Sequence, residues 1–157
     1  MIILDTCVIK EVISSNPQRQ VLQWLDAQDT HHLYLTALSV AELFTAIASL
    51  SEGELKQRFS STLLAMFNQD FSGRILPFDA ASALHYAQLA AQPINHSLSH
   101  TTLQIAAICQ QHQATLATSQ SSAFCTIGIE LINPWQTPSN QRWHEEAAEY
   151  YVMSRKT

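Results

Sequence analysis

The first strand that this sequence predicts ends in a carboxylate. Four apolar residues open the chain at positions 1–4, and a short apolar run of this kind predicts a buried β-strand. Asp5 follows the run directly. In open α/β sheets, functional side chains gather at the carboxyl ends of parallel strands. The opening of the chain therefore predicts a parallel sheet with an acidic residue at its functional edge.

A second acid stands in a similar place, because Glu42 follows an apolar run at residues 33–38. Further along, apolar runs alternate with amphipathic segments, a pattern typical of a mainly parallel central sheet covered by helices on both faces. We therefore predict an α/β protein with three layers, α/β/α. Strands are expected at residues 1–4, 33–35, 74–78, 115–118 and 127–132. Helices are expected at residues 6–13, within 51–71 and at 99–113. Three more helices are expected to begin at Pro17 with Asn16 as cap, at Ser39, and after a cap at Asp79, the last of these ending at residue 91.

Length and charge narrow the classes of function. A chain of 157 residues is typical of one domain with a single core. The formal net charge of -5 argues against a broad, sequence-independent grip on nucleic acid, which needs a basic surface. An acidic protein of this kind suits a basic protein partner or a pocket that holds cations.

The chain divides into a domain and a short extension. Residues 1–135 carry all the predicted elements, and residues 136–157 form a C-terminal extension that begins with a linker. The aromatic and acidic stretch at residues 143–151 fits a surface helix on its own domain and a docking surface equally well. We expect a cytoplasmic protein with reduced thiols, because the three cysteines form no CxxC pair and no apolar stretch is long enough to span a membrane.

Seven local strings resemble, in order, those of the PIN-domain family, and in particular the VapC and FitB toxins of type II toxin–antitoxin modules. The resemblance spans residues 1–135 and implies a PIN-like three-layer α/β/α fold. The matching strings are Met-Ile-Ile-Leu-Asp-Thr from residue 1, Val-Leu-Gln-Trp-Leu from 21, Leu-Thr-Ala-Leu-Ser-Val-Ala-Glu-Leu from 35, Gly-Arg-Ile-Leu-Pro-Phe-Asp from 73, Gln-Ile-Ala-Ala-Ile from 104, Ala-Thr-Leu-Ala-Thr from 114 and Glu-Leu-Ile-Asn-Pro-Trp from 130.

The resemblance implies an endoribonuclease that depends on Mg²⁺ or Mn²⁺. Hard cations of this type prefer oxygen ligands, and they activate water and neutralise phosphate charge during hydrolysis. The first two family acids fall on Asp5 and Glu42, which are therefore the expected catalytic residues and metal ligands. The family further implies an RNA substrate, an antitoxin protein as partner and a homodimer.

The sequence departs from the family pattern at the remaining site positions. Thr102 stands where the third acid is expected, and Ala123 stands where the fourth is expected. Cys7, Ser119 and Gln120 replace an Asn, an Arg and an Asn of the family strings. We therefore expect a degenerate active site whose catalysis is weakened or lost, with any metal held weakly. The alternative is a non-catalytic PIN-fold module that binds an antitoxin-like protein or RNA.

Both retained acids also have a structural interpretation. Asp5 could cap the helix that begins at Thr6, because Asp is a favoured N-cap residue. Ser39 and Glu42 fit a capping box, in which the Glu side chain returns to the backbone amide of the cap. A position lining the site is the favoured interpretation for both acids.

Two other side chains near these positions have weaker functional interpretations. His100 lies close to Thr102 in sequence and could supply an imidazole ligand in place of a lost acid, which would favour Zn²⁺, Ni²⁺ or Mn²⁺ over Mg²⁺. A loop or surface position is favoured for His100. Cys7 is expected to be a small buried filler rather than a reactive thiol.

Overall fold

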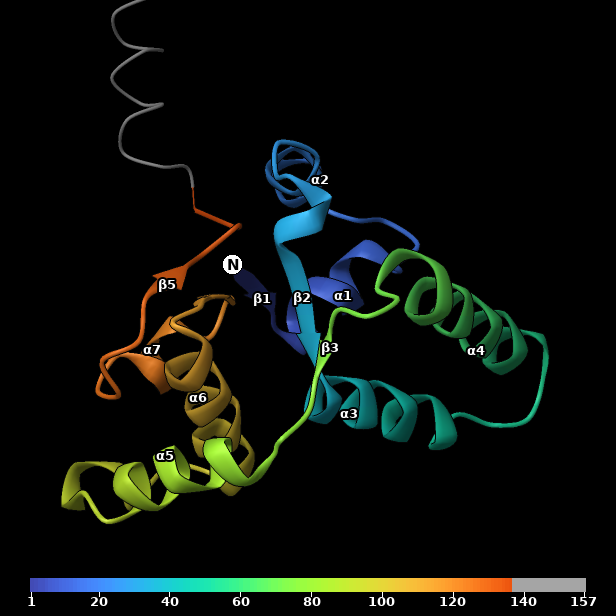
Figure 1. The fold of residues 1–157 in the computed structure, drawn as a ribbon. Coiled ribbons are helices and arrows are strands. Elements are labelled where there is room, and N and C mark those ends of the chain that lie inside the picture. Colours follow the sequence, from blue (N-terminus) through green and yellow to red (C-terminus); the bar gives the residue numbers. More distant parts are fainter. Residues whose placement is uncertain (137–157) are drawn as a thin grey trace, which may run out of the picture.

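The computed structural model describes residues 1–136. Helices alternate with short strands along this part of the chain, as the sequence pattern predicts (Figure 1). The elements follow one another as β1 (Ile2–Leu4), α1 (Thr6–Val12), α2 (Arg19–Asp26), η1 (Thr30–His32), β2 (Leu33–Thr36), α3 (Ala37–Ala48), α4 (Glu54–Ala65), η2 (Met66–Asp70), β3 (Ile75–Leu76), α5 (Ala80–Ala90), η3 (Pro93–Asn95), α6 (His100–His112), β4 (Thr115–Ala117), α7 (Ser121–Phe124) and β5 (Leu131–Ile132).

The five strands form one parallel sheet in the order β3-β2-β1-β4-β5. Its centre is β1, where Ile2 is paired with Leu33 of β2 on one side and with Thr115 of β4 on the other. After β1 the chain therefore adds β2 and β3 on one side of this strand, and it then adds β4 and β5 on the other side. Such a reversal of strand order opens a crevice at the carboxyl ends of the strands.

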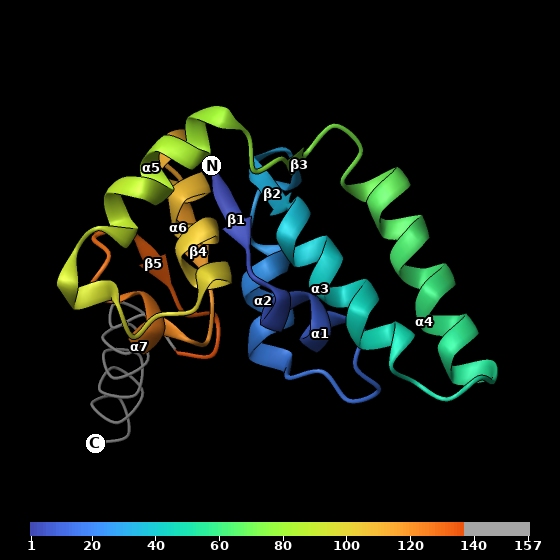
Figure 2. The ribbon, with the colours of Figure 1, turned by 90° about the horizontal axis from the view of Figure 1, so that it is seen from below.

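The core consists of two apolar layers, one on each face of the sheet. Side chains alternate along each strand, so Ile3 packs with α5 and α6 while Leu4 packs with α1 to α4. The same alternation places Leu116 and Ala117 of β4 on opposite faces. The two groups of helices lie on opposite sides of the sheet (Figures 1 and 2). These two layers confirm the predicted three-layer α/β/α architecture.

The predicted boundary of the last strand is wrong. The last strand was expected at residues 127–132, but residues 125–128 form a turn in which Gly128 adopts φ 76°, and β5 spans only Leu131–Ile132. A residue in this left-handed conformation ends an extended strand, and glycine adopts it without strain. Ile127 is buried because it packs against the α6 layer, which explains the apolar pattern that suggested a longer strand.

The second helix does not begin at Pro17, and Asn16 does not cap it. It begins at Arg19, after Gln18, whose side chain makes no capping hydrogen bond. The carboxylate of Glu11 accepts a hydrogen bond from the Gln18 backbone N–H at 2.6 Å, which holds the preceding segment to α1. Asp79 caps α5 as predicted, since its Oδ1 accepts a hydrogen bond from the Ser82 backbone N–H at 2.9 Å.

The proposed extension at residues 136–157 lies, apart from Gln136, outside the described residues, so its division from the domain stays a prediction. Within residues 1–136, none of the helices is both long enough and apolar enough to cross a membrane.

Candidate functional site

The two retained acids lie at the carboxyl edge of the sheet, as the sequence predicts. Asp5 directly follows β1, and Glu42 lies in the second turn of α3, the helix that begins where β2 ends. Thr118 follows β4 on the other side of β1. The Asp5 backbone N–H donates to the Ala117 carbonyl at 3.0 Å, which joins the ends of β1 and β4. The site therefore lies where the strand order reverses.

A cavity of about 610 Å³ opens at this edge. It brings together side chains from four separate segments, and these include four of the five predicted site positions. Its lining consists of Asp5, Thr6, Cys7, Lys10, Leu38, Ala41, Glu42, Thr45, Ser99, Thr101, Thr102, Ile105, Gln120 and Phe124.

Asp5 both caps a helix and lines the cavity. Its Oδ1 accepts a hydrogen bond from the Thr6 backbone N–H at 2.8 Å, at the start of α1. Its Oδ2 accepts a hydrogen bond from the Thr118 hydroxyl at 2.6 Å, and the Cys7 thiol approaches the same oxygen at 3.7 Å. Asp5 is 6% exposed, so these contacts hold a nearly buried carboxylate in one orientation. The two interpretations drawn from the sequence are therefore compatible.

Glu42 does not form the capping box that its sequence suggested. Helix α3 begins at Ala37, and Thr36 caps it by accepting a hydrogen bond from the Ser39 backbone N–H at 3.0 Å. Because Ser39 is inside the helix, Glu42 has no cap amide to bind. Its Oε2 instead accepts a hydrogen bond from the Thr6 hydroxyl at 2.9 Å. Thr6 thus donates to both acids, through its backbone N–H to Asp5 and its hydroxyl to Glu42.

Lys10 is a cavity residue that sequence reasoning missed. Its Nζ lies 3.5 Å from Glu42 Oε1, and both side chains are about half exposed. The spacing Cys7-x-x-Lys10 is the signal that was available, because residues three apart lie on one face of a helix. Among the cavity residues in the described part of the chain, Lys10 is the only cation.

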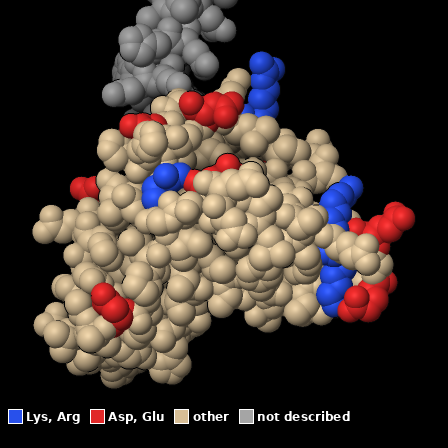
Figure 3. All heavy atoms as spheres, turned by 45° about the vertical axis from the view of Figure 1, so that its right-hand side comes forward, with Lys and Arg blue, Asp and Glu red and all other residues tan. Residues whose placement is uncertain are grey.

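One face of the described chain shows no broad basic area. Figure 3 shows one face on which charged side chains are sparse, and where Lys or Arg atoms mostly lie against Asp or Glu atoms. This pattern agrees with the acidic net charge of the whole chain.

The positions that differ from the family pattern fall into two groups. Thr102, where the family resemblance implies an acid, and Gln120, where it implies an Asn, both line the cavity. Ala123 does not line it and instead packs against the apolar layer formed around α6. Cys7 is half buried and lines the cavity, where its sulfur accepts a hydrogen bond from the Ser119 backbone N–H at 3.4 Å, so it is not simply a buried filler.

His100 is not a ligand in this arrangement. It is exposed at the start of α6 and is not among the residues that line the cavity. Its Nδ1 lies 2.6 Å from the hydroxyl of Tyr86, a residue of α5. The interpretation of His100 as a surface residue therefore agrees with the structure better than the ligand interpretation does.

The cavity has few ligands for the divalent cation that the family resemblance implies. Within residues 1–136, no three His, Cys, Asp or Glu side chains are grouped so that they could hold a metal ion. The donor set does not fit a pair of cations, which needs several bridging and terminal carboxylates. It fits one hard cation held by Asp5 and Glu42, with water and substrate oxygens as the remaining ligands.

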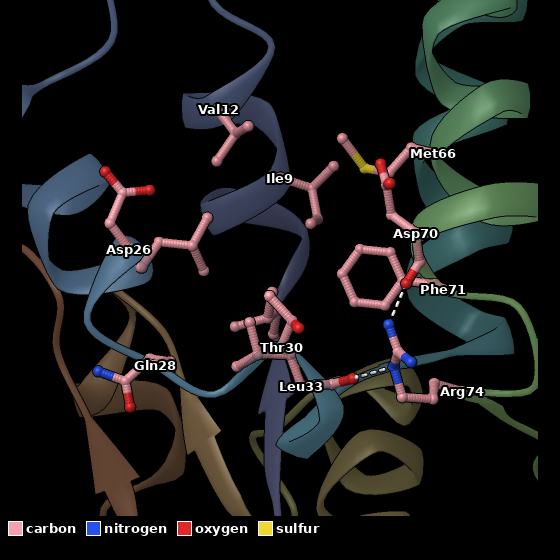
Figure 4. A pocket seen from close by; sticks show the side chains of 12 residues that line it. Ile9, Val12, Asp26, Gln28, Thr30, Leu33, Met66, Asp70, Phe71 and Arg74 are labelled. Atoms are coloured by element: carbon pink, nitrogen blue, oxygen red, sulfur yellow. Dashed lines mark hydrogen bonds between the residues drawn. The ribbon is translucent and has the colours of Figure 1, made fainter.

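A second cavity, of about 450 Å³, lies among α1, α2 and the segment after α4 (Figure 4). Its inner wall is apolar and includes Ile9, Leu33 and Phe71. The Arg74 guanidinium donates to the carbonyls of Leu33 and Asp70 and lies 5.8 Å from the centre of the Phe71 ring. These bonds engage two of the three guanidinium nitrogens, Nε and Nη2, in contacts with the backbone.

The fold and the first cavity define a parallel α/β domain with an acidic site where its strand order reverses. A model of the PIN domain family matches residues 2–128, and the chain belongs to this family.

Within the family, the chain is similar to bacterial toxins of the VapC and FitB type. It is 38% identical over 138 residues to the VapC ribonuclease Y4jK of Sinorhizobium fredii, a match that covers 87% of this chain and 99% of the relative. It is 36% identical over 137 residues to the toxin FitB of Neisseria gonorrhoeae, covering 86% and 99% of the two chains. The crystal structure of FitAcB from Neisseria gonorrhoeae superposes with a TM-score of 0.76 at 35% identity, covering 87% of this chain and all of that chain.

Proposed function

We propose that this chain is a toxin-type PIN protein whose metal-dependent cleavage of RNA is weakened or lost. The observation that carries the proposal is the composition of the cavity. It contains two carboxylates, Asp5 and Glu42, and the neutral Thr102 lines it where the family resemblance implies a third acid. The family membership supports the reaction class, and the missing acids argue for a reduced rate.

The chemistry assigned to the cavity follows from these side chains. A bound Mg²⁺ or Mn²⁺ would supply a polarised water and neutralise phosphate charge, and Asp5 and Glu42 would hold it. Thr118 and the Thr6 backbone N–H orient the Asp5 carboxylate, and the Thr6 hydroxyl orients Glu42. With only two protein carboxylates, the position of one cation is poorly fixed, and a second cation has no ligands of its own.

A basic antitoxin protein is the proposed partner. Solved structures similar to this chain include FitAB bound to a DNA fragment, at 35% identity and a TM-score of 0.78. The acidic net charge of -5 favours a partner rich in Lys and Arg. We further propose a homodimer, which the family resemblance implies, in the cytoplasm, which the cysteine usage favours.

A second candidate is a binding module without catalysis. It is favoured by the contacts that the carboxylate oxygens already make, since each of the four has a partner within the chain. In this case the cavity would bind an antitoxin-like protein or RNA, and its acids would serve recognition and stability.

Cleavage of single-stranded RNA by the purified chain tests both candidates. The assay is run in Mg²⁺ and in Mn²⁺, with Asp5→Asn as the matched inactive variant and the VapC ribonuclease Y4jK as positive control. Slow cleavage that disappears in Asp5→Asn supports a weakened nuclease. No cleavage above the variant, combined with binding of RNA or of an antitoxin in fluorescence anisotropy, supports the binding module. Cleavage as fast as the positive control overturns both.

A further inference from the structure

The ion pair between Lys10 and Glu42 lies inside the candidate metal cavity. Lys10 is in the last turn of α1, and its side chain lines the same cavity as Asp5 and Glu42. The distance from Lys10 Nζ to Glu42 Oε1 is 3.5 Å. The side chains of Lys10 and Glu42 are 49% and 48% exposed, so water and ions reach both of them.

The remaining oxygens of the two acids are also engaged. Asp5 Oδ1 and Oδ2 accept hydrogen bonds from Thr6 and Thr118, and Glu42 Oε2 accepts one from Thr6. Glu42 Oε1 is therefore the one carboxylate oxygen in the cavity whose partner is a charged group. The three charged side chains that line the cavity are two carboxylates and this ammonium.

A divalent cation that binds Glu42 must displace this ammonium or coordinate beside it. Displacement costs the attraction between Lys10 and Glu42, and coordination beside it adds repulsion between an ammonium and a doubly charged ion. For half-exposed groups either effect is modest, and it corresponds to a loss of cation affinity of about tenfold.

We infer that Lys10 is an internal counter-ion of the cavity, which occupies Glu42 and lowers the affinity of the protein for divalent cations. This role is separate from the missing acids, because it acts on a carboxylate that the chain has kept. The inference rests on the proposed assignment of Asp5 and Glu42 as the cation ligands. It predicts that removing the positive charge at position 10 strengthens cation binding without adding a ligand.

Binding of Mn²⁺ to the full chain tests this inference without reference to activity. Electron paramagnetic resonance measures free Mn²⁺ in a titration at low ionic strength, and the dissociation constant is compared among variants. Lys10→Gln is expected to bind Mn²⁺ about tenfold more tightly than the unmodified chain. Lys10→Arg keeps the charge and is expected to bind like the unmodified chain.

A matched control comes from a second ion pair. Lys56 Nζ lies 2.6 Å from Glu52 Oε1, and neither residue lines the cavity. Lys56→Gln removes the same charge from the protein and is expected to leave Mn²⁺ binding unchanged. Circular dichroism on each variant confirms that the fold is retained, and Lys10→Met provides a second neutral substitution.

The outcomes separate this inference from the proposed function. Equal Mn²⁺ affinity for Lys10→Gln, Lys10→Met and the unmodified chain would overturn the counter-ion role. So would an equal gain in Lys56→Gln, which would indicate an effect of net charge alone. If the gain in Lys10→Gln persists when Glu42→Gln is added, the assignment of Glu42 as a ligand is wrong and the inference fails with it. The proposed function fails by a different measurement, which is RNA cleavage at the rate of the positive control.

Discussion

The hydroxyl of Thr118 donates a hydrogen bond to Asp5 Oδ2 across 2.6 Å, and it joins the ends of two neighbouring parallel strands. Thr118 is fully buried, and its Oγ1 also accepts a hydrogen bond from the Gln120 backbone N–H at 3.0 Å. One side chain therefore orients the first acid and shapes the turn that carries Gln120 into the cavity.

Replacing Thr118 with Val is expected to lower the free energy of unfolding by about 1–3 kcal/mol, the cost of leaving a buried polar group without its partner. Val keeps the shape of Thr but has no hydroxyl to donate to Asp5. Thr118→Ser keeps the hydroxyl and is expected to lose less stability. Urea denaturation measures both variants, and an equal loss in Val and Ser would assign the effect to packing of the methyl group instead.

An acid at position 102 is expected to improve cation binding, and an acid at position 123 is not. Thr102 lines the cavity and lies at the third position of α6, where a negative charge is favourable to the helix. Thr102→Asp should therefore bind Mn²⁺ more tightly than the unmodified chain, with Thr102→Asn as the neutral control. Ala123 is partly buried against the apolar layer, so Ala123→Asp is expected to lower the free energy of unfolding by about 1 kcal/mol. Titration with Mn²⁺ and thermal denaturation test the two statements separately.

The three cysteines are expected to differ in reactivity. Burial raises the pKa of the Cys109 thiol to about 12, so this thiol stays protonated and inaccessible at pH 8. Cys125 is exposed and Cys7 is half buried. A thiol reagent whose leaving group absorbs visible light allows the reaction to be followed. It should modify Cys125 fast, Cys7 more slowly and Cys109 only after urea is added. Cys7→Ser should remove the slow phase, and rapid labelling of three thiols in the native protein would contradict the burial of Cys109.

Asp79 is expected to contribute to acid sensitivity. The Ser82 backbone N–H and then the Gln111 amide lower the pKa of its carboxyl below the ordinary value of 3.8. Because the folded pKa is lower than the unfolded one, the stabilisation is complete above about pH 4 and is lost as the pH falls through the folded value. Asn is also a good helix cap but does not titrate in this range. The urea midpoint of Asp79→Asn should therefore fall less between pH 5 and pH 2 than that of the unmodified chain. An equal fall of the two midpoints over this pH range would exclude a contribution from Asp79.

The main features of the fold were predictable because they depend on local patterns. The apolar run before Asp5 and the one before Glu42 each predicted a strand, and both strands lie in the sheet with their acids at the carboxyl edge. The cap of α5 by Asp79 was predictable for the same reason, since one side chain and the following turn determine it.

The features that were wrong or missed depend on residues elsewhere in the chain or on packing in three dimensions. Thr36 supplies the cap of α3 that Ser39 was expected to supply, and the signal Thr36-x-x-Ser39 was present in the sequence. The ion pair of Lys10 with Glu42 joins two separate helices, and no spacing along the chain indicates it. Ala123 stands at a position aligned with a family acid, yet its packing against the core could be seen only in three dimensions.

The central place of β1 affects the order in which the molecule assembles. A ribosome makes this strand before the other strands of the sheet, but one of its two neighbours is β4, in which Thr115 pairs with Ile2. The middle of the sheet therefore stays open on one side until nearly the whole described chain has emerged. Contacts between residues so distant in sequence close slowly, and an unpaired strand edge invites association with other chains. Production of this protein should therefore benefit from slow synthesis at low temperature, which gives β4 time to reach β1 before a neighbouring chain does.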